Sequence, residues 1–403
     1  MKTAYAVIGA GYGDEGKGLM TDYLTLQGSV PMVVRTNGGA QAGHSVQTPD
    51  GRRHVFHHMA SGALAGAATH LSQFFVSHPM FFMRERDAIF DLGGNTSVSV
   101  DPRSIITLPY DMMINQILEK ARGGSRHGSC GVGFGEAIER NLNPEFSLVL
   151  GDFEKGADHI RVVLNRTRLE WVGERLSRLG VSELPAIEGE MLRSSALVER
   201  FIEDCATFWN SITVRHDSEL PGGVLFEGAQ GLLLDQDYGA FPHVTRSNTG
   251  MKNMAVVARE AGIGRINATY MTRAYATRHG AGPFAYEDIS TPWLSMVDPT
   301  NQPNDWQGTI RTAPLDLDAV SAAVTRDLAL TDGVEVKASV GVSCVDQVDE
   351  QMQIGFGGSL INLDKRALAS IVAEASGLSV TKLSFGPTRA DVVDLEAPIA
   401  SAA

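Results

Sequence analysis

The first part of the chain constrains the fold most. Residues 4–8 form a short apolar run that predicts a buried strand, and residues 17–26 have the amphipathic pattern of a helix. The loop between them carries glycines at positions 9, 11, 13, 16 and 18. Backbone N–H groups in such a loop can converge on an anion, and the helix that follows adds the positive end of its dipole. The segment predicts a nucleotide loop like that of P-loop NTPases, although Gly18 stands where a Walker A motif has Ser or Thr.

The same order of strand, glycine-rich polar loop and helix recurs along the chain. This order predicts an α/β fold with a mainly parallel central β-sheet and helices on both faces, and we expect residues 1–403 to form one large domain. Further strands are expected at residues 32–35, 224–226, 268–276, 334–345 and 380–385, and helices at 114–122, 161–179, 191–212 and 363–376.

Composition excludes some classes of protein. The net charge is −13, which argues against binding to nucleic acid polymers or to anionic membranes. Cys130, Cys205 and Cys344 lie far apart, without metal-ligand spacing or a paired framework. The apolar run at the N-terminus is too short for a signal peptide or a membrane span. We therefore expect a cytoplasmic protein, in the host cytoplasm if the source is viral.

Three side chains in these loops can do chemistry. Lys17 can reach a transferred phosphoryl group, and Asp14 can hold Mg²⁺ or accept a proton. His44, in a second glycine-rich loop after residues 32–35, can donate a proton to a phosphate or a purine oxygen. Taken singly, each motif also fits a structural turn with surface charges and a loop histidine without a role.

Five motifs occur in the order found in one family. They are GDEGKG at residues 13–18, GGAQAGH at 38–44, FEGAQG with LD at 226–235, the P-x-V-T-x-S-N-T run at 242–249, and TRHGAGPF at 277–284. Together they resemble the adenylosuccinate synthetase family over about two thirds of the chain. That family joins aspartate to a 6-oxopurine nucleotide: a nucleoside triphosphate first phosphorylates O6, and the aspartate amine then displaces the phosphate.

The resemblance implies roles for individual residues. Asp14 would remove the purine N1 proton, His44 would bind the developing charge on phosphate and O6, and Lys17 would stabilise the phosphoryl group. Mg²⁺ would bind Asp14 and the carbonyl of Gly43. The implied nucleotide-binding residues are Gly13, Glu15, Gly16, Gly18, Gln41, Ala42, Ser45, Ser129, Cys130, Gln230, Thr245, Arg140, Asp346, Gly386 and Pro387, and the implied aspartate-binding residues are Gln307, Gly308, Thr309 and Arg311.

Departures from the family pattern gather at substrate loops. Of the four arginines in the family's aspartate loop only Arg311 survives, and Thr309 replaces one that also approaches the ribose 2′-hydroxyl. The guanine-reading TKLD becomes SCVD at residues 343–346, and His279 replaces a small apolar residue. These changes, with the SCGVGFGE loop at 129–136, resemble the viral branch, the 2-aminoadenylosuccinate synthetases that take dGMP, aspartate and ATP or dATP.

Asp14 favours the other branch, because many viral members carry serine there. Two substrate sets therefore stay open: dGMP with ATP or dATP, for diaminopurine DNA, and the housekeeping pair of IMP and GTP. A catalytically dead nucleotide sensor is a third possibility, which intact Asp14, Lys17 and His44 argue against. The resemblance also implies a homodimer, in which Arg140 would reach the substrate phosphate across the two-fold axis.

Overall fold

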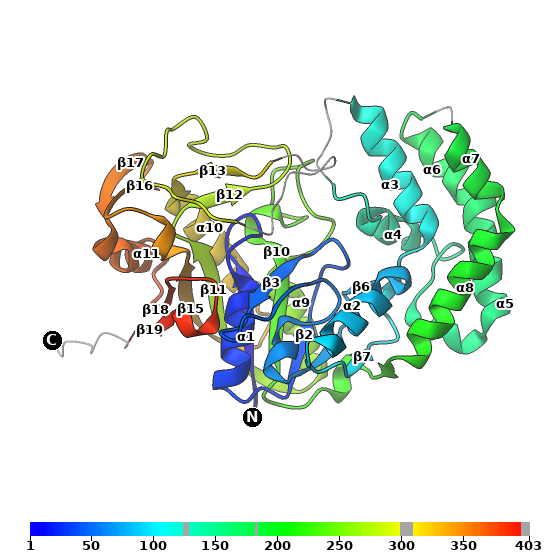
Figure 1. Cartoon of the computed structure of the whole chain (residues 1–403), viewed down its shortest axis with the longest axis horizontal. Helices are drawn as coiled ribbons and strands as arrows, with labels where there is room; N and C mark the ends of the chain where they lie inside the picture. Colours follow the sequence, from blue (N-terminus) through cyan, green and yellow to red (C-terminus); the bar gives the residue numbers. More distant parts are fainter. Residues whose placement is uncertain (124–128, 182–183, 299–308, 396–403) are drawn as a thin grey trace.

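A ten-stranded sheet forms the centre of the molecule (Figure 1). The computed structural model describes residues 1–123, 129–181, 184–298 and 309–395. The strand order is β19-β18-β15-β11-β1-β10-β2-β5-β7-β9, and all neighbours are parallel except β18 and β19. The strands are β1 Lys2–Gly9, β2 Met32–Arg35, β5 Ala68–Leu71, β7 Val98–Val100, β9 Thr213–Val214, β10 Leu225–Gly231, β11 Ile263–Arg273, β15 Glu335–Ser343, β18 Val380–Ser384 and β19 Val392–Asp394.

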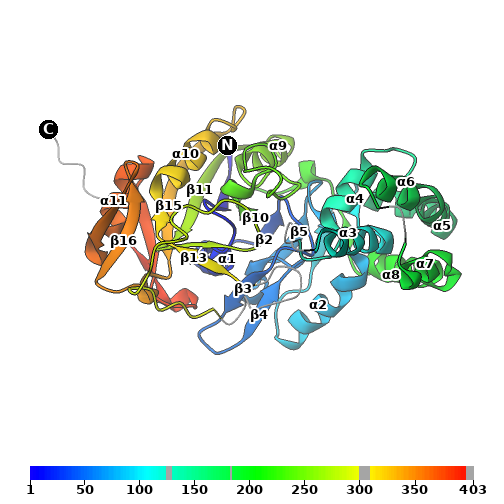
Figure 2. The ribbon, with the colours of Figure 1, turned by 90° about the horizontal axis from the view of Figure 1, so that it is seen from above.

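Helices cover both faces of this sheet, as expected. Helices α9 and α10 lie on one face and α1 on the other, while α3 to α8 form a helical layer beside the β5–β7 end (Figure 2). The helices are α1 Lys17–Gln27, α2 Pro79–Asp91, α3 Pro109–Arg122, α4 Phe134–Asn141, α5 Ala157–Arg166, α6 Val172–Arg178, α7 Ala186–Arg193, α8 Ser195–Asn210, α9 Met251–Glu260, α10 Leu317–Leu328 and α11 Leu368–Ser376. The central strands are buried from both sides, which is why they read as apolar runs in the sequence.

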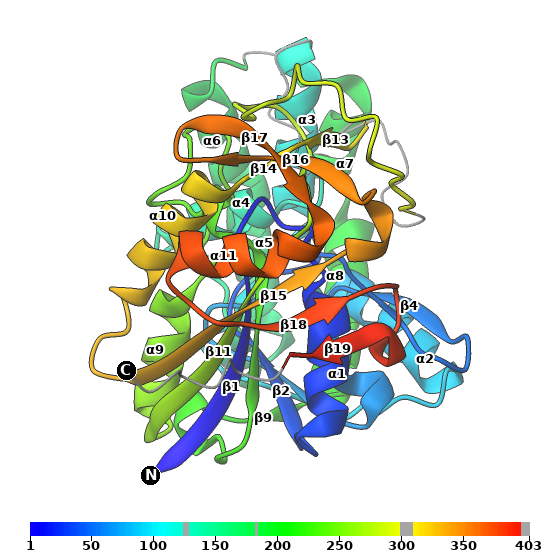
Figure 3. The ribbon, with the colours of Figure 1, turned by 90° about the vertical axis from the view of Figure 1, so that its left-hand side faces the viewer.

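Smaller strands lie beyond the carboxyl end of the central sheet. A three-stranded sheet, β14-β16-β17, stands above α11, and the β12–β13 pair lies beside it (Figure 3). The small strands are β12 Ala276–Arg278, β13 Arg311–Ala313, β14 Leu315–Asp316, β16 Gln351–Phe356 and β17 Ser359–Asp364; the pairs β3 His44–Gln47 with β4 Arg53–Phe56, and β6 Val76–Ser77 with β8 Ile105–Ile106, lie elsewhere.

The predicted α/β class and parallel sheet are confirmed, and β2 has the predicted bounds. The single domain over 1–403 stays a prediction. The helix predicted at 363–376 is wrong in its first turn: β17 extends to Asp364, whose side chain caps a short 3-10 turn before α11 begins. The helix predicted at 191–212 is two helices, because Ser194 accepts from the backbone N–H of Leu197 and starts α8.

Candidate functional site

The predicted site residues lie along the carboxyl edge of the sheet. Strands β18, β15, β11, β1, β10 and β2 are consecutive neighbours and parallel, so their carboxyl ends form one row (Figure 1). Ligands of open α/β sheets bind at this edge. From β18 to β2, the ends of these strands and the segments that follow them carry Gly386 and Pro387, Asp346, His279, the loop of residues 13–18, Gln230, and the segment from Gln41 to Ser45.

The glycines of the loop after β1 allow close packing. Gly16 has φ 80°, a left-handed conformation that glycine adopts without strain, and it begins α1. A Cβ on Gly18 would lie 2.6 Å from the backbone oxygen of Ser45, because β3 packs against the first turn of α1. A serine or threonine therefore cannot occupy this position, which explains why the loop departs from the Walker A pattern.

The amides of this loop bind an anion, which in this structure is a side chain of the loop itself. Glu15 accepts hydrogen bonds from the backbone N–H groups of Gly11 and Gly13, at 3.0 and 2.7 Å. Lys17 donates to the other carboxylate oxygen of Glu15 at 2.7 Å and to the carbonyl of Gly13. The Glu15 side chain thus uses the groups predicted to bind phosphate, and it must move away before a phosphate can take its place.

Asp14 is held from two sides. The Nε2 atom of His279 lies 3.1 Å from Asp14 Oδ2. Arg273, the last residue of β11, donates from Nε to the backbone carbonyl of Asp14. Burial by itself raises the Asp14 pKa, but the hydrogen bond with His279 and the charges of Arg273 and Lys17 lower it to about 2. Asp14 is therefore ionised near neutral pH.

An ionised Asp14 suits Mg²⁺. Mg²⁺ is normally held by one or two carboxylates together with substrate phosphates. Asp14 supplies such a carboxylate, and Gly43 is exposed and can offer its carbonyl. Within the described residues, no group of three or more His, Cys, Asp or Glu could hold a metal ion. The donors therefore fit a cation shared with a bound phosphate better than one enclosed by protein alone.

His44 forms a buried pair with Glu227. Its Nδ1 lies 2.7 Å from Oε1 of Glu227. The Glu227 carboxylate also accepts hydrogen bonds from the hydroxyl of Ser61 at Oε1 and from its backbone N–H at Oε2, and Oε2 lies 3.9 Å from a guanidinium nitrogen of Arg35. Burial lowers the His44 pKa to about 4 despite the raising effect of Glu227. Burial raises the Glu227 pKa, but Arg35 and His44 bring it down to about 2. The ionised carboxylate can only accept, so Nδ1 carries the hydrogen, and Nε2, which has no hydrogen-bond partner among the described residues, is left for a ligand.

Two glutamines lie at this edge of the sheet. Within the part of the chain that the structure describes, the oxygen and nitrogen of the Gln41 side chain are buried without hydrogen-bond partners, which buried amides normally have, so this amide is available to a ligand. Gln230, at the end of β10, has φ 64°, a strained conformation for a residue other than glycine. Ala42 is buried, Ser45 is half-buried, and Thr245 is half-buried with its N–H bonded to the carbonyl of Leu234.

The loop between α3 and α4 carries Ser129 and Cys130. Asn115 of α3 donates to the hydroxyl of Ser129 at 2.8 Å. Burial raises the pKa of the Cys130 thiol to about 11, so this cysteine is a neutral thiol near pH 7. Their proposed role in binding a 5′-phosphate is therefore one of hydrogen bonding and shape and not of thiolate chemistry.

The predicted aspartate-binding residues lie next to the Asp14 side of the site. Arg311 of β13 pairs with Arg278 of β12, and its guanidinium donates to the carbonyls of Gly280 and Gly282 on either side of the turn that carries His279. Arg311 also forms a 2.8 Å ion pair with Glu287. Thr309 is exposed just before this strand, whereas Gln307 and Gly308 lie outside the described residues.

The predicted triphosphate-base residues lie at the far end of the row. Asp346 is exposed in the short 3-10 turn after β15, and Gly386 and Pro387 follow β18, which pairs with β15. Cys344 stands between Ser343 and this turn, with φ 58°. Burial raises the Cys344 pKa, so the position carries no charge.

The structure contradicts the prediction for Arg140. Its side chain is 0% exposed and forms an ion pair with Asp111, with Nε donating at 2.9 Å. It also donates to the backbone carbonyls of Phe146 and Ile106. A guanidinium enclosed in this way cannot reach a substrate phosphate across a dimer axis. Arg140 instead holds the end of α4 against the start of α3.

Substitution of Arg140 is therefore expected to reduce stability and to leave substrate binding unchanged. Arg140→Met should lower the free energy of unfolding by about 3–5 kcal/mol, because it leaves Asp111 buried without its cation. The KM for the monophosphate should stay within twofold in the protein that folds. Urea unfolding and steady-state kinetics measure the two quantities, with Arg200→Met, at an exposed ion pair, as the control that changes stability by less than about 1 kcal/mol. A tenfold rise in KM at unchanged stability would restore the phosphate role.

The sequence patterns did not assign a role to three residues of the candidate site. Glu227 stands inside the FEGAQG motif, but nothing local indicates that it meets His44. Arg273 ends a strand and gives no motif signal. His279 stands out only as a polar residue in place of a small apolar one. All three are placed by contacts between distant parts of the chain.

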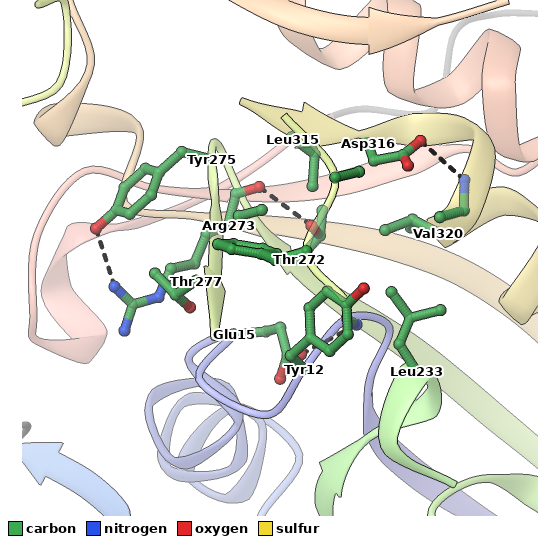
Figure 4. A pocket seen from close by; sticks show the side chains of 15 residues that line it. Tyr12, Glu15, Leu233, Thr272, Arg273, Tyr275, Thr277, Leu315, Asp316 and Val320 are labelled. Carbon is green, nitrogen blue, oxygen red and sulfur yellow. Dashed lines mark hydrogen bonds between the residues drawn. The ribbon is translucent and has the colours of Figure 1, made fainter. Parts of the chain in front are cut away.

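A pocket lies beside the loop of residues 13–18 (Figure 4). Tyr12 and Leu233 lie on one side of it, and Leu315 and Asp316 on the other. Glu15 and Arg273 also line it, but Asp14, His44 and Gln230 do not. The pocket therefore adjoins the loop through Glu15 and Arg273, while Asp14 and His44 do not line it.

Comparison with known proteins identifies the family. The family model described as adenylosuccinate synthetase matches residues 6–344. The chain belongs to the adenylosuccinate synthetase family. Curated adenylosuccinate synthetases from Clostridium perfringens and Clostridium botulinum Eklund 17B are 33% and 34% identical over 294 and 307 residues. These matches cover 71% and 72% of this chain, and 65% and 68% of the relatives.

Two solved structures share the fold of this family member. One is a fully ligated adenylosuccinate synthetase from Plasmodium falciparum, with a TM-score of 0.70 over 98% of this chain and 100% of that one. The other is the cyanophage S-2L succinoaminodeoxyadenylate synthetase bound to dGMP and dATP, with a TM-score of 0.63 over 98% of this chain and 95% of that one. Both are 17% identical to this chain, so the likeness concerns the fold.

Among the described residues, no helix is long and apolar enough to cross a membrane.

Proposed function

We propose that the chain is a carbon–nitrogen ligase that joins L-aspartate to C6 of a 6-oxopurine nucleoside monophosphate through a 6-phosphoryl intermediate. Its substrates are dGMP, L-aspartate and ATP or dATP. The product is 2-amino-2′-deoxy-N6-succinyladenylate, a precursor of diaminopurine in DNA. The single observation that carries the choice of dGMP is Thr309, which stands where the family has an arginine near the ribose 2′-hydroxyl.

The residues around Asp14 and His44 can perform the first step. Asp14, ionised and held beside the phosphate loop, takes the N1 proton of the purine and raises electron density on O6. His44 takes up a proton from solvent at Nε2 as negative charge approaches and then donates it in a hydrogen bond to the phosphate, and Glu227 behind it stabilises this imidazolium. Lys17 leaves Glu15 and pairs with the transferred phosphoryl group. Mg²⁺, held by Asp14 and the Gly43 carbonyl, would spread the charge of that group.

The second step uses the β12–β13 side of the site. Arg311 binds an aspartate carboxylate with its forked guanidinium. It must first give up Glu287, an exchange of one carboxylate for another. The aspartate amine then forms a bond to C6, the C6–O6 bond breaks, and inorganic phosphate leaves with O6 and takes up the proton that the amine loses. Arg311 donates to the carbonyl of Gly280, next to His279, which supports binding of aspartate on the Asp14 side of the site.

The absence of a cation at residue 344 supports ATP or dATP over GTP. The family lysine that flanks guanine falls on Cys344, which is a neutral, half-buried thiol. The preceding Ser343 is buried and bonded to the carbonyls of Glu15 and Thr272, so it faces the phosphate loop. No side chain at this position can therefore place a positive charge over a guanine ring. The cyanophage synthetase, which is bound to dATP as an energy donor, has the same fold.

A housekeeping synthetase that uses IMP and GTP is the second candidate. Asp14 favours it, as do the curated relatives, which are named as adenylosuccinate synthetases. Retention of Asp14 also fits dGMP, because guanine presents N1–H and the 2-amino group on one edge and a carboxylate can accept from both.

Steady-state assay of a substrate panel tests the proposal. We expect kcat/KM with dGMP and ATP to exceed that with IMP and GTP by at least about 100-fold, because a mismatched polar edge or missing donor costs roughly this much or more. GMP in place of dGMP and dATP in place of ATP complete the panel. Turnover restricted to IMP and GTP would establish the housekeeping activity instead.

The homodimer is also a proposal, now without support from Arg140, and light scattering coupled to gel filtration tests it.

A further inference from the structure

The carboxylate of Asp14 has a partner outside the family pattern. His279 follows β12, at a position where the family carries a small apolar side chain. Its Nε2 lies 3.1 Å from Asp14 Oδ2. A small apolar residue cannot make this contact, so the side chain of Asp14 in this chain has a constraint that the general family pattern lacks.

The turn that presents His279 is itself rigid. Arg278, which precedes it, is 1% exposed and donates to the carbonyls of Pro283 and His243. Its guanidinium lies 4.5 Å from the ring centroid of Tyr12, two residues before Asp14. Gly282 has φ 111°, and a Cβ there would lie 2.3 Å from the Arg278 side chain, so the turn closes tightly on this arginine. The backbone that carries His279 is thus fixed to the loop that carries Asp14.

The backbone of Asp14 is fixed by different residues. Arg273 donates to the Asp14 carbonyl, and Ser343 donates from its hydroxyl to the carbonyl of Glu15 at 3.1 Å. These bonds from β11 and β15 hold the main chain but leave rotation about the Cβ–Cγ bond of Asp14 open. That rotation is broad for a carboxylate. Among the side chains that the structure describes, His279 forms the ion pair with the Asp14 carboxylate and so restricts this rotation.

We propose that His279 is a positioning residue that orients the Asp14 carboxylate toward the purine edge; this rests on the proposed function. The ionised carboxylate can only accept, so Nε2 of His279, 3.1 Å from Oδ2, is the hydrogen-bearing nitrogen of this pair. The pair fixes the carboxylate plane, so the remaining acceptor positions face the N1–H of the bound purine and, in dGMP, the 2-amino group. Proton transfer depends strongly on such alignment, because a misplacement of about 1 Å can cost roughly 100-fold in rate.

Substitution of His279 tests this role. His279→Val restores the apolar type of the family and should lower kcat about 10- to 100-fold, with the KM for the monophosphate within threefold. His279→Asn and His279→Gln keep an N–H donor without an ionisable ring, and at least one of them should recover most of the lost kcat. His159→Val, at a partly exposed histidine on α5, should keep the wild-type kcat. Thermal unfolding of each variant separates misfolding from misalignment.

The outcomes are distinct. If His279→Val keeps the wild-type kcat, or if neither amide variant is faster than the valine variant, His279 does not position Asp14. All variants are assayed with whichever substrate pair the wild type prefers, so a preference for IMP and GTP overturns the proposed substrate without deciding this question. Crystal structures of wild type and His279→Val give a readout that needs no turnover. One Asp14 orientation in the wild type and more than one in the variant supports the role, and the same single orientation in both overturns it.

Discussion

Asp14→Asn should lower kcat about 1,000-fold and leave the fold intact. The substitution keeps size and shape, but the amide cannot accept a proton, and general-base catalysis by a positioned side chain is worth roughly 100- to 10,000-fold. It also removes the only charged donor proposed for Mg²⁺ at this point of the loop. The contacts that hold the backbone, from Arg273 to the Asp14 carbonyl and from Ser343 to the Glu15 carbonyl, do not involve the carboxylate.

The measurement is kcat with the best substrate pair, together with the dissociation constant of the monophosphate by calorimetry. We expect the dissociation constant to change by less than about tenfold, because Asp14 acts mainly in the transition state. Asp346→Asn is the matched control, because it makes the same change from aspartate to asparagine at an exposed residue of the 3-10 turn after β15. It should affect the KM for the triphosphate without a comparable loss of kcat. A kcat for Asp14→Asn within tenfold of the wild type would exclude Asp14 as the base.

Glu227→Gln should lower kcat about 100-fold, through His44. Glu227 is fully buried, and its carboxylate accepts from His44 Nδ1 at 2.7 Å. That bond selects the tautomer with the hydrogen on Nδ1 and stabilises the imidazolium when negative charge approaches Nε2. A glutamine at this position carries no charge and can donate to Nδ1, which disfavours the cation. His44→Gln should cause a loss of similar size, and the double variant should lose little more, because the two residues act as one unit.

Glu85→Gln provides the matched control. Glu85 is also a buried glutamate beside a histidine, accepting from the backbone N–H groups of His57, His58 and Met59, with His58 Nδ1 at 3.3 Å. Its substitution should reduce the melting temperature but leave kcat of the folded enzyme within threefold. If Glu227→Gln also reduced only the melting temperature, the pair with His44 would be structural.

Local patterns in the sequence determined the elements and the order of the loops. The apolar run of residues 4–8, the glycines after it and the amphipathic pattern of residues 17–26 correspond to β1, the phosphate loop and α1. Parallel strands in turn place the loops after β18, β15, β11, β1, β10 and β2 at one edge, so the gathering of the motif residues follows from the predicted sheet. Boundaries failed where a side chain caps a new element, at Ser194 and Asp364.

The roles of single charged residues were decided by tertiary structure. Arg140 has the sequence context of a helical surface charge, yet Asp111, 29 residues earlier, encloses it in the core. His44 and Glu227 are separated by 183 residues, and Arg273 and Asp14 by 259. Periodicity and spacing describe only neighbours along the chain, whereas the charge state and direction of a buried group depend on whatever the fold brings against it. The sequence by itself therefore determined the sheet and the glycine-rich loop after its first strand, but only the tertiary structure decided that His279 contacts Asp14, that Glu227 contacts His44 and that Arg140 is enclosed by Asp111.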